Sequence, residues 1–452
     1  MTTFWTLGRA AEALQLTLAP GVDPSLELTS VSTDTRTVRD GGLFVALRGE
    51  RYDAHAFLRD AVERGARALV ISDPAAADGL DVPVLTVRDT LAALGALGRY
   101  RRRAWGGPVI AVAGSNGKTS TKELLTAALG VTKRVHATSG NFNNQVGVPL
   151  TLLAIPDDAE VAVVEVGTSA PGEVAILRSL CEPRIAVVTS IGEEHLEGLH
   201  DLEGVLREEA SIFDGVAVGV VPTGQPEIGS AAVRRARRVI SAGLASGDLH
   251  ADEWRVLPDG TGEMIVRGVR VHVPLRGSHN MRNAMLALAA AECMGVRIAY
   301  AARGLAQVKQ PAMRMAWEEM GRAVVLNDAY NANPPSMRAA LELVVAAAGG
   351  RPTVAILGTM RELGEDSAAL HAAVARDALA APLALIAGVG SFAEALVAEG
   401  SADPRVVTAP DIEQLWPILE PRLSPDSLIL LKGSRGARLE RLLPYLSAWA
   451  VS

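Results

Sequence analysis

Residues Val109 to Glu123 read VIAVAGSNGKTSTKE, and this stretch decides the fold class. Its apolar start predicts a buried strand, a glycine-rich turn follows, and a helix-forming run begins near Lys118. Small residues let backbone N–H groups approach phosphate oxygens, Lys118 adds a positive charge, and the Thr119 hydroxyl can reach Mg²⁺. We therefore predict a phosphate loop for ATP or GTP, formed by Gly114, Ser115, Asn116, Gly117, Lys118, Thr119 and Ser120.

The loop departs from the strict G-x-x-x-x-G-K-[ST] pattern, because Val112 stands at the position of its first glycine. The alternative interpretation is an ordinary glycine turn before a helix. The complete order of strand, turn, Gly-Lys-Thr and helix favours the phosphate loop.

The composition is that of a globular protein: 452 residues, 49% hydrophobic and 21% charged, which suggests about three domains. A net charge of -7 argues against nucleic acid as a partner. No apolar window is long enough to span a bilayer, and the N-terminal residues lack the apolar core of a secretory signal. Cys181 and Cys293 form no metal or disulfide pattern, so we expect a cytoplasmic protein without membrane insertion.

Lysine is rare in this chain, since only five of its 44 basic residues are lysines. In a sequence that otherwise uses arginine, a lysine inside a motif is less often incidental. Lys118 and Lys432 are the two lysines that lie in such motifs.

The pattern of strands and helices divides the chain into three blocks. We predict an α/β protein with a small N-terminal α/β domain (1–104), a central phosphate-loop domain with a mostly parallel sheet (105–310) and a Rossmann-like C-terminal α/β domain (311–452). In the third block, strands alternate with helices expected at 336–348, 367–380, 392–399 and 437–448.

Two polar residues follow apolar strands of the central block, where parallel sheets bind ligands. Glu165 ends the strand at 161–166 and is a hard oxygen ligand suited to Mg²⁺, although it could simply be solvated. His195 follows the next strand in the sequence IGEEHLEG, and alone it would be an ordinary surface histidine.

Three further loops are candidates for binding polar ligands. The amide-rich run with Asn143 and Asn144 is suited to bind a polar substrate or to form an Asx turn. Asp328 and Asn331 can bind a ribose or a phosphate, or belong to the turn before the next helix. Lys432 lies in the sequence KGSR at a predicted helix start, which makes it a candidate anion site or part of a charge-balanced loop.

The ordered motifs of the whole chain resemble those of the Mur ligase family, the ATP-dependent amide-bond ligases of peptidoglycan precursor synthesis. They are Asp34-Thr-Arg36, Gly140-Asn-Phe-Asn-Asn-Gln-Val-Gly147, Glu165-Val-Gly-Thr-Ser169, His195-Leu-Glu-Gly198, His279-Asn280, Asp328 to Pro334, Gly358-Thr-Met-Arg-Glu-Leu-Gly364 and Lys432-Gly-Ser-Arg435. Within the family the match is to the member that adds a dipeptide. The resemblance implies that ATP phosphorylates the carboxylate of a UDP-N-acetylmuramoyl-tripeptide and that D-alanyl-D-alanine attacks the acyl phosphate.

The same resemblance implies roles for individual residues, with ATP and Mg²⁺ as cofactors. Lys118, Glu165, His195 and Arg314 are the implied catalytic residues. Thr119, Glu165 and His195 are implied at the metal, Asn280 and Asn283 at adenine, and Arg314, Asp328 and Asn331 at ribose and phosphates. The implied substrate contacts are Asp34, Thr35, Arg36, Asn143, Asn144 and Lys432.

One family feature is absent, because Mur ligases commonly use a carbamylated lysine shortly after the His195 position. No lysine occurs between Lys133 and Lys309. The matching segment places Glu209 at that position, and we predict that its carboxylate, or less favourably that of Glu208, serves the metal instead. The alternative is a solvated helix face on which both glutamates are dispensable.

Other functions remain open from the sequence. Another amino-acid-adding Mur ligase or a folylpolyglutamate-synthase-like ligase would use the same ATP chemistry. A nucleotide-binding scaffold without ligase activity is a third class, against which Lys118, Glu165 and His195 argue. We expect a monomer.

Overall fold

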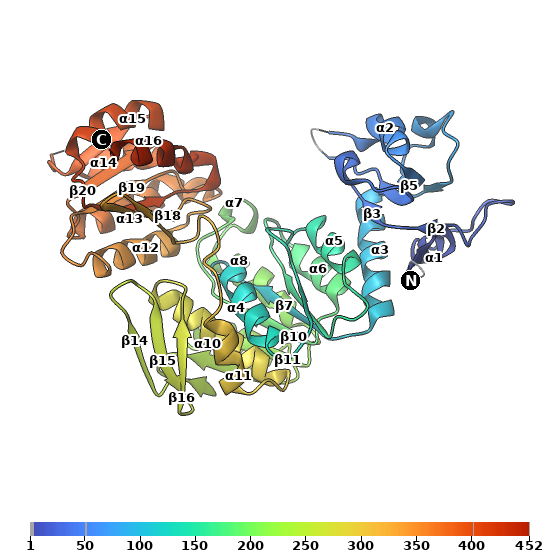
Figure 1. The fold of residues 1–452 in the computed structure, drawn as a ribbon, viewed down its shortest axis with the longest axis horizontal. Coiled ribbons are helices and arrows are strands. Elements are labelled where there is room, and N and C mark those ends of the chain that lie inside the picture. The colour runs from blue at the N-terminus through green and yellow to red at the C-terminus, as the bar shows by residue number, and fades with distance from the viewer. Residues whose placement is uncertain (1–3, 50–51, 401, 452) are drawn as a thin grey trace. The chain divides into compact units, whose positions relative to one another are not determined.

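The computed structural model describes residues 4–49, 52–400 and 402–451, and its elements are drawn in Figure 1. The first three residues of the N-terminal run that argued against a secretory signal lie outside the described residues. The chain forms two compact units. The first contains Met1–Ala111, Arg134–Gly167 and Ala175–Pro183, and the second contains Val112–Lys133, Thr168–Val174 and Arg184–Ser452.

The N-terminal part of the first unit is built on a small parallel sheet with the order β3-β4-β5-β6. Every residue of β4 is buried, as expected for a strand that is covered on both faces. An antiparallel pair, β1 with β2, precedes the sheet. The elements are β1 Trp5–Thr6, α1 Leu7–Ala13, β2 Glu27–Leu28, β3 Val31–Ser32, β4 Gly42–Val45, α2 Leu58–Glu63, β5 Ala66–Ile71, β6 Val84–Thr86 and α3 Thr90–Trp105.

A seven-stranded sheet has the order β13-β12-β11-β10-β7-β9-β8. Its pairs β8–β9, β10–β11, β11–β12 and β12–β13 are parallel, which confirms the expected parallel character. The strands are β7 Val109–Ala113, β8 Val135–Ala137, β9 Val161–Glu165, β10 Ile185–Val188, β11 Val218–Pro222, β12 Val239–Gly243 and β13 Leu249–His250.

The connections of this sheet carry helices. In the second unit, α10 and α11 pack against α4, which begins at Lys118 (Figure 1). The helices are α4 Lys118–Gly130, α5 Gly147–Leu153, α6 Glu173–Cys181, α7 Leu196–Leu199, α8 Leu202–Ala210, α9 Pro226–Val233, α10 Ser278–Cys293 and α11 Ile298–Leu305.

A three-stranded antiparallel sheet, β14-β15-β16, was not foreseen from the sequence. Its strands are β14 Glu253–Val256, β15 Gly262–Val266 and β16 Val269–Val273. The pairing of Val266 with Val269 leaves a two-residue turn, Arg267-Gly268, in which both φ angles are positive. Such a turn matches the twist of a hairpin, so the alternation of apolar and polar residues around it was the missed signal.

The C-terminal part of the second unit is a six-stranded sheet with the order β17-β18-β22-β19-β20-β21. All of its pairs are parallel except β17–β18, so an antiparallel edge strand precedes the expected alternation of strand and helix. The elements are β17 Ala316–Met320, β18 Ala323–Asp328, α12 Pro334–Ala346, β19 Thr353–Leu357, α13 Ser367–Ala380, β20 Leu385–Val389, α14 Ser391–Gly400, β21 Val406–Ala409, α15 Ile412–Leu419, β22 Leu428–Lys432 and α16 Leu443–Trp449.

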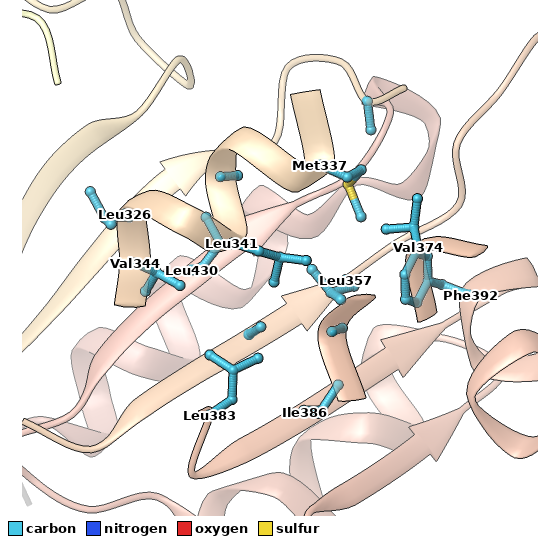
Figure 2. Packing of buried hydrophobic residues seen from close by; sticks show 14 of the residues in the cluster. Leu326, Met337, Leu341, Val344, Leu357, Val374, Leu383, Ile386, Phe392 and Leu430 are labelled. Atoms are coloured by element: carbon cyan, nitrogen blue, oxygen red, sulfur yellow. The ribbon is translucent and has the colours of Figure 1, made fainter. Parts of the chain in front are cut away.

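Successive residues of these strands enter two separate cores. Leu326, Leu357 and Leu430 pack with Met337 and Leu341 of α12 on one face, as Figure 2 shows. Their neighbours along the strands, such as Ile356 and Ile429, belong to the core on the other face. Helices therefore cover both faces, which is the doubly wound arrangement that the sequence predicted.

The expected helix over 437–448 is wrong in its first half. Short 3-10 segments occupy Arg435–Ala437 and Leu439–Leu442, and Arg438 between them has a positive φ of 52°. The α-helix begins only at Leu443. Pro444 lies at its N-terminal end, where a missing N–H is harmless, whereas further inside a helix a proline would break a backbone hydrogen bond.

Candidate active site

The loop between β7 and α4 has the predicted strand, turn and helix. Gly114 and Gly117 have φ angles of 115° and 87°, which favour glycine. A Cβ on Gly117 would lie 2.8 Å from the amide of Asn283, and one on Gly114 would collide with Thr189. Both glycines are therefore required by the backbone and by close neighbours, and α4 begins directly after the second of them.

The chain after β10 holds this loop in place. The Ser115 N–H donates to the Ser190 carbonyl at 2.7 Å, and the Gly192 N–H donates to the Ser115 hydroxyl at 2.9 Å. The Asn116 N–H donates to the Ser190 hydroxyl at 3.1 Å, and the Thr189 hydroxyl donates to the Asn116 carbonyl at 2.6 Å. The loop is thus fixed by protein contacts, and the hydroxyls of Thr119 and Ser120 are mostly buried beside it.

Lys118 is folded back onto the loop that it follows. Its ammonium donates to the carbonyls of Gly114 and Ser115 and lies 3.5 Å from Oε1 of Glu194. Glu194 is 5% exposed, and burial raises the pKa of its carboxyl although the charges of Lys118 and His195 oppose the rise. Sequence reasoning missed Glu194, and the acidic pair directly before His195 was the available signal.

The two glutamates at the end of α8 have different hydrogen-bond partners. Glu209 has no exposed surface, and its Oε2 accepts a hydrogen bond from the Gly114 N–H at 2.7 Å. Its Oε1 has no hydrogen-bond partner, and burial raises the pKa of its carboxyl to about 7. Glu208 instead accepts hydrogen bonds from the N–H groups of Gly172 and Val174 at 2.7 and 2.8 Å. Glu209 therefore faces the phosphate loop, while Glu208 fixes the start of α6.

His195 lies immediately before α7 with a positive φ of 53°. Its Nδ1 pairs with the carboxylate of Glu362, and its Nε2 lies 3.9 Å from Oε2 of Glu194. Burial works against protonation of this ring, but the Glu362 contact and the charge of Glu194 outweigh it and raise the pKa of His195. An imidazole held between two carboxylates remains charged above the ordinary histidine range.

Glu165 and the amide-rich loop lie together in the first unit. Glu165 is 1% exposed, its Oε1 accepts a hydrogen bond from Asn143 at 2.9 Å, and its Oε2 has no hydrogen-bond partner. Asn144 instead accepts hydrogen bonds from the N–H groups of Val146 and Gly147. The Asx-turn interpretation is therefore correct for Asn144, whereas Asn143 orients a buried carboxylate.

The candidates of the C-terminal sheet meet at the ends of two neighbouring strands. Asp328 of β18 is paired in register with Lys432 of β22, and their side chains form an ion pair of 2.6 Å. Lys432 also donates to the Asn331 carbonyl at 2.8 Å. Arg314 stacks on the Tyr330 ring at 4.1 Å from its centre. Lys432, predicted to contact substrate, is 2% exposed and already has protein partners.

Two asparagines of α10 complete the surroundings of the loop. Asn280 donates to the Arg276 carbonyl at 2.8 Å and accepts a hydrogen bond from Asn283 at 3.1 Å. Asn283 in turn packs against Gly117. The two amide side chains therefore fix each other's orientation next to the N-terminus of α4.

Asp34 and Arg36, two of the three N-terminal candidates, form a local ion pair. Asp34 accepts hydrogen bonds from the backbone and the guanidinium of Arg36, and these contacts lower the pKa of the Asp34 carboxyl to about 2. Thr35 lies between them in a 3-10 turn.

Across the described part of the chain, no three His, Cys, Asp or Glu side chains are grouped so as to hold a metal ion. Thr119, Glu165, His195 and Glu209 consequently stay predicted metal ligands. The unpartnered oxygens of Glu165 and Glu209 fit such a role, because a buried carboxylate oxygen without a partner is a hard ligand for Mg²⁺. Within residues 4–49, 52–400 and 402–451, no helix combines the length and apolarity that crossing a bilayer requires.

Comparisons with known proteins give consistent results. Profiles described as "Mur ligase family, catalytic domain", "Mur ligase middle domain" and "Mur ligase, glutamate ligase domain" match residues 27–102, 112–291 and 313–435. A Bacillus subtilis protein named UDP-N-acetylmuramoyl-tripeptide--D-alanyl-D-alanine ligase is 34% identical over 98% of each chain.

Two solved structures are similar over nearly the whole chain. A crystal structure of MurF from Acinetobacter baumannii has a TM-score of 0.91 and 31% identity, over 98% of this chain and 99% of that one. MurF ligase from Thermotoga maritima in complex with ADP has a TM-score of 0.81 and 25% identity, over 93% and 98%. The three-domain α/β fold expected from the sequence is confirmed.

Proposed function

The chain belongs to the Mur ligase family, and from that premise we propose that it joins D-alanyl-D-alanine to a UDP-N-acetylmuramoyl-tripeptide with ATP. The observation that carries the proposal is the likeness, over 98% of both chains, to a protein of that name. The geometry of the phosphate loop supports it, because a fixed loop with two glycines at positive φ leads into a helix N-terminus.

The reaction activates a carboxylate that is by itself a poor electrophile. One oxygen of the tripeptide's terminal carboxylate attacks the γ-phosphorus of ATP, so that an O–P bond forms, the β–γ bond breaks and ADP leaves. The free amine of the dipeptide then attacks the carbonyl carbon of the acyl phosphate, loses a proton, and inorganic phosphate departs with the C–O bond pair. No protein nucleophile is needed.

The phosphate loop supplies electrostatic stabilisation. Backbone N–H groups of the loop bind phosphate oxygens, and Lys118 turns from Glu194 and the loop carbonyls toward the negative charge on the transferred phosphoryl group. Mg²⁺, held by residues among Thr119, Glu165, His195 and Glu209, supplies further charge compensation at the phosphates when bound. Because the loop is ordered by its own contacts, little reorganisation is needed on binding.

The remaining residues are proposed to position the substrates. We assign Asn280 and Asn283 to adenine, and Arg314, Asp328 and Asn331 to ribose and phosphates. Asp34, Thr35 and Arg36 are assigned to the UDP end, and Asn143, Asn144 and Lys432 to the peptide. Asn144 and Lys432 must exchange their present partners to act in this way. We further propose a cytoplasmic monomer, which size-exclusion chromatography of the purified chain tests.

The decisive experiment is a phosphate-release assay with ATP, Mg²⁺ and matched acceptors and amines. We expect phosphate release only when a UDP-N-acetylmuramoyl-tripeptide and D-alanyl-D-alanine are both present, with mass spectrometry showing the pentapeptide product. Release with a single amino acid instead of the dipeptide, or with a folate acceptor, would assign the chain to another ligase. ATP binding without any amine-dependent release would contradict ligase function.

A further inference from the structure

The segment 189–195, which follows β10, is held by two separate sets of hydrogen bonds. Residues of this segment bond to Ser115 and Asn116 of the phosphate loop. Ile191, in the middle of the segment, has the side chain of Gln225 as its partner. The Ile191 N–H donates to Oε1 of Gln225 at 2.8 Å, and Nε2 of Gln225 donates to the Ile191 carbonyl at 2.7 Å. One amide therefore satisfies both backbone groups of Ile191.

Gln225 acts where the backbone pairing of β10 with β11 has ended. The paired residues run as far as Val187 and Val220. In the same register Pro222 would stand opposite Thr189, and a proline has no N–H to donate. A primary amide offers an acceptor and a donor, as a peptide group does. The side chain of Gln225 therefore replaces a strand neighbour beyond the end of the ladder.

The position of Ile191 affects two contacts of the phosphate loop. Its neighbour Gly192 donates to the Ser115 hydroxyl at 2.9 Å. Three residues further along the chain, Glu194 lies 3.5 Å from the ammonium of Lys118. A displacement of Ile191 would disturb both contacts. Gln225 is also the N-cap residue of α9, but its side chain makes no hydrogen bond to that helix, so it does not serve as a helix cap.

We propose that Gln225 is a positioning residue for the nucleotide site. By binding both backbone groups of Ile191, it fixes the segment 189–195 and, through the contact of Gly192 with Ser115, the phosphate loop. The inference rests on the proposed nucleotide-dependent function and adds a residue that acts on the loop only through this segment.

The first test measures hydrogen–deuterium exchange of the full chain without ligand. Gln225→Met keeps the length of the side chain and removes both hydrogen bonds. We expect faster exchange in peptides that cover 189–195 and also in those that cover the phosphate loop, 114–119. Gln414→Met is the matched control, because Gln414 is an exposed glutamine of α15 whose amide bonds to Asp411, and both regions should exchange as in the wild type. Unchanged exchange of the loop in Gln225→Met would overturn the inference.

The second test measures the affinity of a fluorescent ADP analogue. Gln225→Met should weaken binding at least about fivefold, because two hydrogen bonds that order the site are lost. The stoichiometry should stay near one, which a partly unfolded sample would not give. In a Ser115→Ala background the further loss caused by Gln225→Met should be at least about threefold smaller, since the link through Ser115 is already broken. Equal losses in the two backgrounds would overturn the inference.

A second variant and the two readouts keep the outcomes distinct. If Gln225→Met does not fold, Gln225→Glu retains the acceptor for the Ile191 N–H and loses the donor, and the same comparison with Ser115→Ala applies to it. A wild-type chain that binds no ADP analogue would contradict the proposed function, while the exchange measurement, which needs no ligand, would still decide whether Gln225 orders the loop. Normal affinity and exchange in a Gln225 variant of an active ligase would overturn only the role of Gln225.

Discussion

Lys118 is the side chain on which the proposed chemistry depends most. Its replacement by alanine should reduce ligation more than tenfold, a barrier increase above about 1.4 kcal/mol, because it removes charge from the transferred phosphoryl group. The fold should persist, since the ammonium contacts loop carbonyls and Glu194. The exchange of Lys133 for alanine is the control. Circular dichroism and ligation are measured on the same samples, and retention of more than about a tenth of the rate would contradict the assignment.

We predict that the buried His371 contributes to the stability of the fold and that this contribution is lost in acid. Its Nε2 accepts a hydrogen bond from the Met360 N–H and its Nδ1 donates to the Ser367 carbonyl, so the buried ring is neutral. Burial lowers the pKa of His371 below its ordinary 6.5. As the pH falls, His371 of the unfolded chain therefore takes up a proton before His371 of the folded chain does. The contribution of His371 to folding stability is complete above about pH 6.5 and is lost as the pH falls toward the folded-state pKa.

The measurement compares melting temperatures of the wild type and of His371→Gln between pH 8 and pH 5. Glutamine cannot be protonated, so the variant should begin less stable and lose less on acidification. Equal losses in both proteins would show that His371 does not contribute.

The local geometry of single residues could be predicted where it depends on their sequence neighbours, whereas their chemical roles stay predictions. The phosphate loop and Lys118 were predicted from one continuous stretch of sequence. The alignment of one short segment was enough to favour Glu209 over Glu208 as the residue that faces the loop. Glu194 was missed because its importance comes from burial beside Lys118, which is far away in the sequence. Asn144 shows why residue type alone leaves two interpretations open, since an amide suited to ligand binding also caps a turn.

At the scale of elements, α12 begins with a reciprocal cap that is open to test. Asn333 accepts a hydrogen bond from the Ser336 N–H, and the Ser336 hydroxyl is 3.0 Å from the Asn333 backbone nitrogen. Replacing Asn333 with alanine should cost about 1 kcal/mol and lower the melting temperature, whereas serine can still cap and should cost less. Thermal unfolding of the three proteins measures this. Identical melting of the alanine variant and the wild type would show that the cap contributes nothing.

Element prediction succeeded for the α/β alternation and failed where long-range pairing decides. The buried strands β7, β9 and β19 are continuous apolar runs, so their sequence alone marks them. Strands β14 and β17 are partly or fully exposed and are stabilised by antiparallel partners, which composition does not reveal. The late start of α16 shows that one proline can outweigh an otherwise helical pattern.

At the scale of the whole molecule, the placement of the five lysines makes a prediction about carbon dioxide. No lysine lies between Lys133 and Lys309, so the central region cannot form a lysine carbamate there, and Glu209 provides a carboxyl group that needs no carbon dioxide. Ligation by the wild type should be unchanged in buffers depleted of bicarbonate. Rates are compared before and after bicarbonate is restored, and a rate that recovers on its addition would mean that a carbamate forms elsewhere.

Strands that are neighbours in the central sheet are far apart in the sequence, which affects how the chain folds during translation. The first compact unit is completed only at Pro183. Strand β7 ends at Ala113 and its neighbour β10 begins at Ile185, so at about 5–20 residues per second β10 is made roughly 4–14 s after β7. We expect the nascent polypeptide to expose the apolar strand β7 during that interval. It is therefore expected to bind chaperones that act on nascent chains.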